Sequence, residues 1–139
     1  MAADLRVRLL EVVEEAQRIA RTTDATPGEQ LLAQLIERFP FTAALVANTE
    51  GRYVAANRAA SELTGYGQQE LLTLSVWDLT PPAGERDVDV LWRAFLQQRE
   101  QSGVFTLVTR DGRTVEAPYA ARAHVLPGFH LSLLKRSSE

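Results

Sequence analysis

Apolar side chains near the start of the chain recur every three or four residues. Charged and polar side chains occupy most of the positions between them, so the pattern is that of one apolar stripe along a helix. It predicts an amphipathic helix over residues 4–22. The stripe consists of Leu5, Leu9, Val12, Ala16 and Ile19.

A second helix is expected after a short polar break. Thr26 precedes Pro27, and Glu29 lies three residues after Thr26, which is typical of an N-cap, a proline in the first turn and a capping box. The predicted helix spans residues 27–38, and Pro40 marks its end.

The rest of the chain mixes two periodicities. Alternation of apolar and polar residues predicts strands, and apolar residues at helical spacing predict the helices between them. The expected strands are 42–47, 52–56, 104–109, 114–125 and 129–134. The expected helices are 58–63, 68–72 and 85–101, the last stopped by Gly103.

The longest of these strands, 114–125, shows the alternation most clearly. Apolar residues from Val115 to Val125 alternate with a second set that includes Glu116, Arg122 and His124. One face of this strand is therefore expected to be buried and the other to be largely polar.

Two strands, a helical stretch and three further strands predict an α+β fold. The expected architecture is a five-stranded antiparallel sheet with helices on one face, preceded by two N-terminal helices. We divide the chain into a helical extension for capping or dimerisation (1–39), a main domain (40–136) and a disordered tail (137–139).

Composition removes several function classes. The chain has 15 basic and 18 acidic residues, interspersed, so no basic stripe is available for direct nucleic-acid binding. It has no cysteine, which excludes disulfides, thiolate metal sites and a catalytic thiol. The N-terminal stretch is too rich in charge for a signal peptide or a membrane span, so we expect a cytoplasmic protein without membrane contact.

From Thr42 to Arg136 the chain resembles PAS domains. The string ALVANTEGRYVAANRAASELTGYGQQELL, residues 44–72, is similar to the family's first strand, glycine turn, second strand ending in Asn, and helix ending in Leu-Thr-Gly-Tyr. The positions that carry the resemblance are Gly51, Asn57, Gly65, Tyr66, Glu70, Leu71, Ser75, Asp78, Leu79 and the hairpin Arg110-Asp111-Gly112. We interpret Asn57 as a helix cap and sheet-to-helix tether rather than a catalytic group.

The resemblance implies a sensory or protein-interaction module of a bacterial-type signalling system, including regulators of transcription, and not an enzyme. Such a module would sense a small molecule or a partner protein and act as a homodimer. Two interpretations of the N-terminal stripe stay open, because it would pair with a second copy or pack on the outer face of its own sheet. We assign Leu5, Leu9, Val12, Ala16 and Ile19 to the dimer interface.

The same resemblance limits the cofactors. Light-sensing members bond a flavin or a thioester-linked chromophore to a cysteine, and this chain has none. Haem-binding members take an axial histidine from the long helix, and residues 85–102 contain none. His124 and His130 lie on the last two strands, and we interpret them as surface or interface histidines rather than metal ligands.

A ligand pocket is expected between the inner face of the sheet and the long helix. Its lining would be apolar and aromatic, which favours a small apolar ligand, although an ordinary packed core has the same composition. The predicted lining is Leu45, Val54, Trp92, Phe95, Leu96, Phe105, Leu107, Ala117, Tyr119 and Ala121.

Two other functions remain as alternatives. One is a dimerisation domain without a ligand. The other is a small α+β isomerase or dehydratase, which would need an inward-facing aspartate and tyrosine. No serine lies in a nucleophile elbow, and no glycine-rich phosphate loop is present, so the sequence assigns no catalytic residue.

Overall fold

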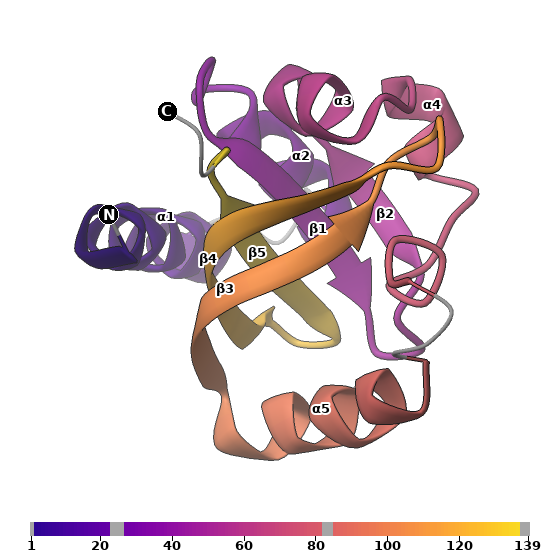
Figure 1. The fold of residues 1–139 in the computed structure, drawn as a ribbon. Coiled ribbons are helices and arrows are strands. Elements are labelled where there is room, and N and C mark those ends of the chain that lie inside the picture. The colour runs from indigo at the N-terminus through magenta and orange to yellow at the C-terminus, as the bar shows by residue number, and fades with distance from the viewer. Residues whose placement is uncertain (1, 23–26, 82–84, 137–139) are drawn as a thin grey trace.

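The computed structural model describes the backbone of residues 2–22, 27–81 and 85–136. The chain forms a five-stranded antiparallel sheet in the order β2-β1-β5-β4-β3 (Figure 1). The strands are β1 (Ala43–Asn48), β2 (Tyr53–Ala56), β3 (Glu100–Val108), β4 (Thr114–Leu126) and β5 (Phe129–Leu134). The helices are α1 (Ala2–Thr22), α2 (Gly28–Ile36), α3 (Arg58–Thr64), α4 (Gln68–Leu71) and α5 (Glu85–Gln98).

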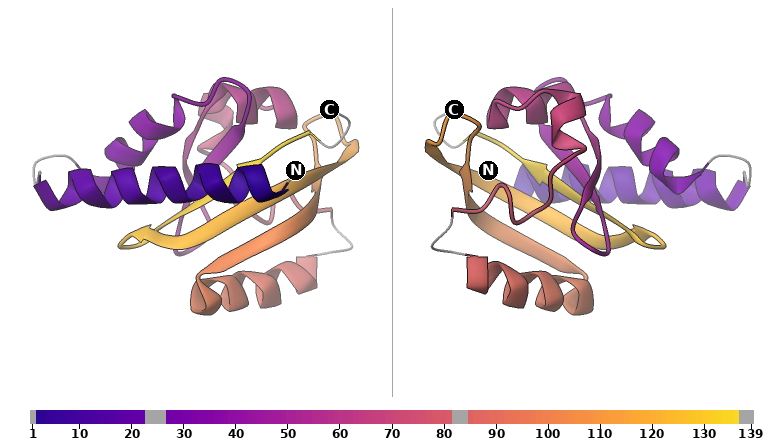
Figure 2. Two further views of the ribbon diagram at one scale, coloured as in Figure 1. Left: turned by 90° about the vertical axis from the view of Figure 1, so that its left-hand side faces the viewer. Right: turned by 90° about the vertical axis from the view of Figure 1, so that its right-hand side faces the viewer.

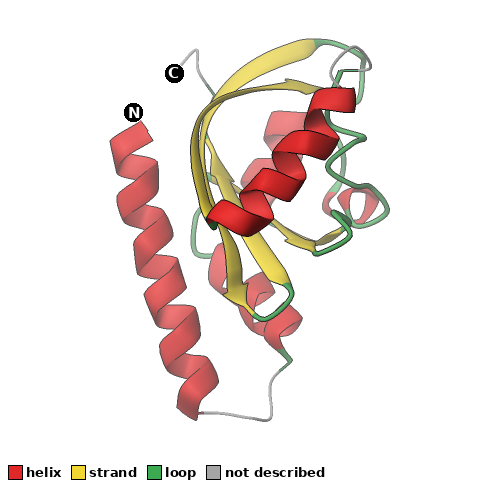
Figure 3. Ribbon diagram, turned by 90° about the horizontal axis from the view of Figure 1, so that it is seen from below, coloured by secondary structure: helices red, strands yellow, loops and turns green. Residues whose placement is uncertain are grey.

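Helices cover the sheet on both sides. The N-terminal helices α1 and α2 lie against one face, which we call the outer face (Figure 2). Helix α5 crosses the opposite, inner face, and α3 and α4 lie at its edge beside β1 and β2 (Figure 3). The predicted antiparallel sheet and the two preceding helices are confirmed, with the later helices on one face and the N-terminal pair on the other.

The apolar stripe on α1 packs against the outer face of the sheet in the same chain. Leu5 and Ala16 are fully buried, and Leu9 and Val12 nearly so, in one cluster with apolar residues of α2 and the strands. Ile19 packs against the edge of the same cluster. Of the two interpretations of the stripe, the structure shows the intramolecular one.

Asn57 joins three elements through one buried amide. Its Oδ1 accepts hydrogen bonds from the backbone N–H groups of Ala60 (2.9 Å) and Ala44 (3.0 Å), so it caps α3 and holds β1. Its Nδ2 donates to the carbonyls of Ile36, Phe39 and Thr42. The predicted cap and tether is confirmed.

The junction after α5 differs from the prediction. Arg99 adopts a left-handed backbone (φ 75°), which ends the helix at Gln98, and β3 begins one residue later at Glu100. Gly103 therefore lies inside a strand and does not stop the helix. The spacing of apolar residues carries no information about a single left-handed residue. The helix end was therefore predicted too late in the sequence.

The alternation predicted for the long strand is wrong beyond Arg122. His124 has a positive φ of 55° and lies in a bulge, where the pairing of β4 with β5 shifts between Arg122 and Leu126. The extra residue turns Val125 toward α1 on the outer face, whereas Ala123 stays on the inner face. The expected polar face is covered only in part, because Ala120 is buried beneath α1 whereas Glu116 is exposed.

The start of α2 is shifted by one residue. Pro27 is the residue before the helix rather than its first residue, and it makes no side-chain cap. The predicted cap at Thr26 and the predicted tail at 137–139 lie outside the described residues.

Candidate ligand-binding site

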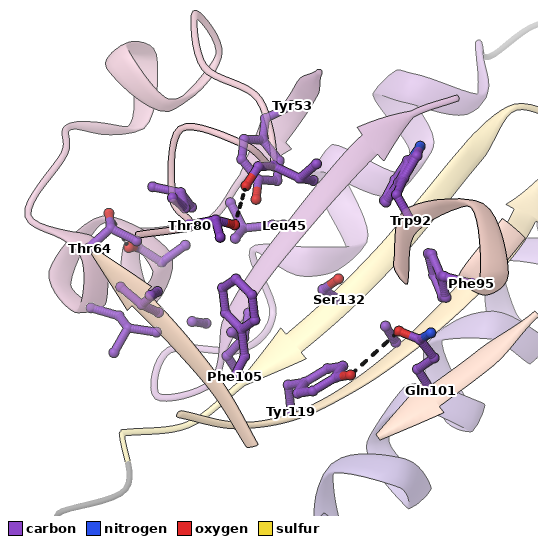
Figure 4. A pocket seen from close by; sticks show the side chains of 18 of the residues that line it. Leu45, Tyr53, Thr64, Thr80, Trp92, Phe95, Gln101, Phe105, Tyr119 and Ser132 are labelled. Atoms are coloured by element: carbon purple, nitrogen blue, oxygen red, sulfur yellow. Dashed lines mark hydrogen bonds between the residues drawn. The ribbon is translucent and has the colours of Figure 1, made fainter. Parts of the chain in front are cut away.

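A cavity of about 130 Å³ lies between the inner face of the sheet and the helices that cover it (Figure 4). All five strands contribute to one wall, and α3, α5 and the loop after α4 form the other. The lining residues are Ala43, Leu45, Tyr53, Ala60, Leu63, Thr64, Val76, Leu79, Thr80, Leu91, Trp92, Phe95, Gln101, Phe105, Leu107, Tyr119, Ala121, Ser132 and Leu134.

Most of the lining expected from the sequence is brought together here. Seven of the ten residues face the cavity, from three strands and α5, and they are Leu45, Trp92, Phe95, Phe105, Leu107, Tyr119 and Ala121. Leu96 packs beside the cavity against Phe95 and Ala123, and Ala117 is buried in the surrounding core.

Val54 does not line the cavity, and a second bulge explains why. Tyr53 pairs with Ala47, whereas Ala55 pairs with Val46, so Val54 is an extra residue without a partner. It packs with the outer cluster beneath α2, on the opposite face of the sheet. The bulge instead turns Tyr53 inward, and simple alternation from Val54 predicts the reverse.

Other lining residues come from segments that the sequence marked only as helix or turn. Leu63 and Thr64 end α3, while Val76, Leu79 and Thr80 belong to the loop that leads toward α5. An irregular loop has no periodicity, so only its individual apolar residues hinted at burial. Ser132 carries a usable signal, because it alternates with Leu131 and Leu133, which face the outer cluster.

The lining is apolar apart from a few hydroxyls and one amide, and none of the described residues that form it is charged. Thr64 donates its hydroxyl to the carbonyl of Ala60, and Thr80 donates to that of Val76, both at 2.9 Å. These two hydroxyl protons are therefore used within the chain. At the far end the Tyr119 hydroxyl lies 3.4 Å from Oε1 of Gln101.

Two hydroxyls of the lining, those of Tyr53 and Ser132, make no hydrogen bond with any described residue. Tyr53 is the larger of the two, and only 8% of the residue is exposed. Burial raises the pKa of this phenol, and the nearby carboxylate of Asp78 raises it further, so Tyr53 is neutral at physiological pH.

A buried histidine adjoins the cavity. His130 packs edge-on against the rings of Trp92 and Phe95, with centroids 5.6 and 6.2 Å away. Its Nδ1 accepts the backbone N–H of His124 at 2.9 Å, which leaves Nε2 as the donor to the Thr49 hydroxyl at 3.2 Å. Desolvation, aided by the charge of His124, lowers the pKa of His130 to about 4.

The prediction of a surface histidine is therefore wrong for His130, which is 2% exposed. Among the described residues, no group of three or more histidine, cysteine or acidic side chains is placed to hold a metal ion. No helix in the described part of the chain is long and apolar enough to cross a membrane.

The domain is an α+β domain with an internal cavity. Its five-stranded antiparallel sheet and its short helices together enclose a small apolar cavity. Comparison with known proteins supplies the family: a model of the PAS fold matches residues 36–127. The chain belongs to the PAS fold family. No curated protein matches its sequence significantly.

Solved structures agree on the fold. A PAS domain from Colwellia psychrerythraea aligns with a TM-score of 0.64 at 16% identity, covering 75% of this chain and 92% of that one. A domain of a sensor histidine kinase/response regulator from Geobacter sulfurreducens aligns at 0.57 and 24% identity, covering 73% and 89%. The PAS domain of a LuxR-family transcriptional regulator from Burkholderia thailandensis, in complex with ethanol, aligns at 0.63 and 10% identity, covering 76% and 97%.

Proposed function

We propose that this chain is a sensory module that binds a small neutral ligand in the inner cavity and reports binding through contact with a protein partner. The observation that carries this proposal is the cavity itself, about 130 Å³ in volume and walled mainly by apolar and aromatic side chains. Native cores close-pack and leave few voids larger than a water molecule, so a space of this size is unusual.

The volume indicates the size of the ligand. Pockets for drug-sized molecules begin at roughly 300 Å³, whereas an apolar cavity of roughly 150 Å³ accepts benzene. A ligand of about that size fits this cavity, and haem or flavin is far larger. The Burkholderia PAS domain was solved in complex with ethanol, a small neutral molecule, and this supports a ligand of small size.

The isomerase-like alternative finds no support in the cavity. General acid–base catalysis at a carbon centre requires a positioned carboxylate, histidine or comparable base. The described lining contains neither a carboxylate nor a histidine, and its two tyrosines both have raised pKa values because of burial. Binding, rather than chemistry, is the function that these residues favour.

The dimer proposed from the sequence needs a different surface. With Leu5, Leu9, Val12 and Ala16 buried in the same chain, the apolar side chains that α1 offers to a partner are Val7 (59% exposed) and Leu10 (46% exposed). We propose that a second copy contacts this side of α1, as the flanking helices of PAS domains commonly do.

Native mass spectrometry of freshly purified protein tests both parts of the proposal. A mass excess over the denatured protein would reveal a bound molecule, and the same spectrum reports monomer and dimer. Titration with small neutral aromatics would follow for protein without a ligand. A protein that takes up none of them is a ligand-free interaction domain, which overturns the sensory proposal.

A further inference from the structure

We propose that the Tyr53 hydroxyl selects the ligand, and that the cavity takes a compact apolar molecule carrying one neutral hydrogen-bonding oxygen, such as a phenol or a short alcohol. This inference rests on the proposed function, because it names the ligand class for the same cavity.

The first argument is the unused hydrogen-bonding capacity of Tyr53. Every fully enclosed side-chain nitrogen or oxygen among the described residues has a partner. The Tyr53 hydroxyl has none among these residues, so its oxygen is not fully enclosed, and its side chain lines the cavity beside Thr80 and Leu45 (Figure 4). A phenol hydroxyl left without a partner in an apolar site is costly, and a ligand oxygen there would relieve that cost.

The second argument is that the two threonine hydroxyls of the lining are less available, which leaves Tyr53 and Ser132 as the lining hydroxyls without a partner among the described residues. The hydroxyls of Thr64 and Thr80 already donate hydrogen bonds to backbone carbonyls of their own segments. The backbone of Tyr53 is tied to the loop after α4, because its N–H donates to the carbonyl of Leu74 at 3.0 Å. A fixed donor without an internal acceptor is the arrangement that confers selectivity for a polar group.

The third argument concerns charge. No described residue in the lining bears a cation that could neutralise an anionic ligand, and none bears an anion that could neutralise a cationic one. Burying an unpaired charge in such a site is strongly unfavourable. The ligand oxygen is therefore a hydroxyl, carbonyl or ether oxygen and not a carboxylate.

Phenol and toluene are matched probes, since they differ by one hydroxyl in place of a methyl group. Each would be titrated into the full chain and into Tyr53→Phe, following tryptophan fluorescence because Trp92 lines the cavity, with calorimetry as the second readout. Tyr66→Phe is the control, because Tyr66 packs near the cavity without lining it.

The wild-type chain should bind phenol more tightly than toluene, and Tyr53→Phe should weaken phenol binding about tenfold while toluene binding is retained. Tyr66→Phe should bind both probes like the wild type. Binding of both probes with a phenol-to-toluene ratio that Tyr53→Phe does not change would overturn the role of Tyr53 and leave the proposed function intact.

Failure of both probes to bind the folded wild-type protein would count against the proposed function itself. If Tyr53→Phe does not fold, the wild type still decides the question with anisole, which accepts a hydrogen bond without donating one. Phenol and anisole should both exceed toluene in affinity. Equal affinity for the three probes would overturn the proposal.

Discussion

At the residue scale, His130 places a titratable group where water does not reach it. Both ring nitrogens are engaged, with Nδ1 as an acceptor, and that bond requires the neutral imidazole. The folded pKa of about 4 lies below the ordinary value near 6.5, so protons bind more strongly to the unfolded chain. The neutral ring therefore contributes its full stability above about pH 6.5, and this contribution is lost as the pH falls toward 4.

We expect the free energy of unfolding to fall by about 3 kcal/mol between pH 7 and pH 4 on account of this residue. Urea unfolding at several pH values would measure it in the wild type and in His130→Asn, whose amide oxygen replaces the Nδ1 acceptor without titrating. The variant should lose that part of the pH dependence. Parallel curves for the two proteins would show that His130 is not responsible.

Two glycines with nearly the same backbone conformation offer a matched comparison. Gly51 (φ 81°) and Gly128 (φ 80°) both occupy the left-handed region, which disfavours a side chain. A Cβ on Gly51 would lie 2.4 Å from the Trp77 ring, whereas a Cβ on Gly128 would meet nothing within 4 Å.

Gly128→Ala should therefore cost about 1 kcal/mol for the backbone alone, and Gly51→Ala should cost at least about 2 kcal/mol because Trp77 must also move. Chemical denaturation of the two variants measures the difference. Equal losses would mean that the turn accommodates the methyl group without displacing the tryptophan.

At the scale of the element, α1 carries two apolar sides with different roles. Leu9 is 3% exposed against the sheet, and its neighbour Leu10 is 46% exposed on the side we propose for a second copy. Leu10→Asp should convert a dimer to monomer with stability nearly unchanged, while Leu9→Asp should unfold or strongly destabilise the chain because it buries a charge. Light scattering after size exclusion, with thermal unfolding, separates the two effects. A Leu10→Asp protein that remains dimeric would move the interface away from this side of α1.

The elements could be read from the sequence because most of them follow a single period. The strand that contains Leu131 and Leu133 and the helix stripe through Leu5 and Leu9 were each predicted at or near their bounds. The errors fall at Arg99, His124 and Val54, where one residue leaves the regular backbone. A bulge depends on pairing with a strand that is distant in the sequence, so the pattern within one strand cannot reveal it.

The candidate site was predictable to the same extent. Residues on regular strands and on α5, such as Phe105 and Phe95, were placed correctly on the inner face. Tyr53 was missed because the β2 bulge decides its direction, and Thr80 was missed because its loop has no period. The burial of His130 arises from α5 crossing over β5, a tertiary contact that no local pattern records.

At the scale of the molecule, two neighbouring alanines on β4 distinguish a cavity from a core. Ala121 lines the cavity on the inner face, and Ala120 lies under α1 on the outer face. Ala121→Leu should fill the cavity, abolish binding of phenol and toluene, and leave stability similar or higher. Ala120→Leu should overpack the outer cluster at a cost of about 1–3 kcal/mol. Thermal unfolding and titration of both variants would check this, and equal destabilisation would mean that the space beside Ala121 cannot accept a side chain.

The sheet is a single layer whose alternate residues belong to different compartments: on β5, Leu131 and Leu133 pack under α1, whereas Ser132 and Leu134 face the cavity. A ligand that changes the curvature of these strands would therefore also change how tightly α1 packs on the outer face. Thermodynamic linkage makes this exchange reciprocal, so a partner that holds α1 in one position changes ligand affinity by the same factor by which the ligand changes the partner's affinity. The concentration at which such a sensor responds would then be set by what occupies its outer face as well as by its cavity.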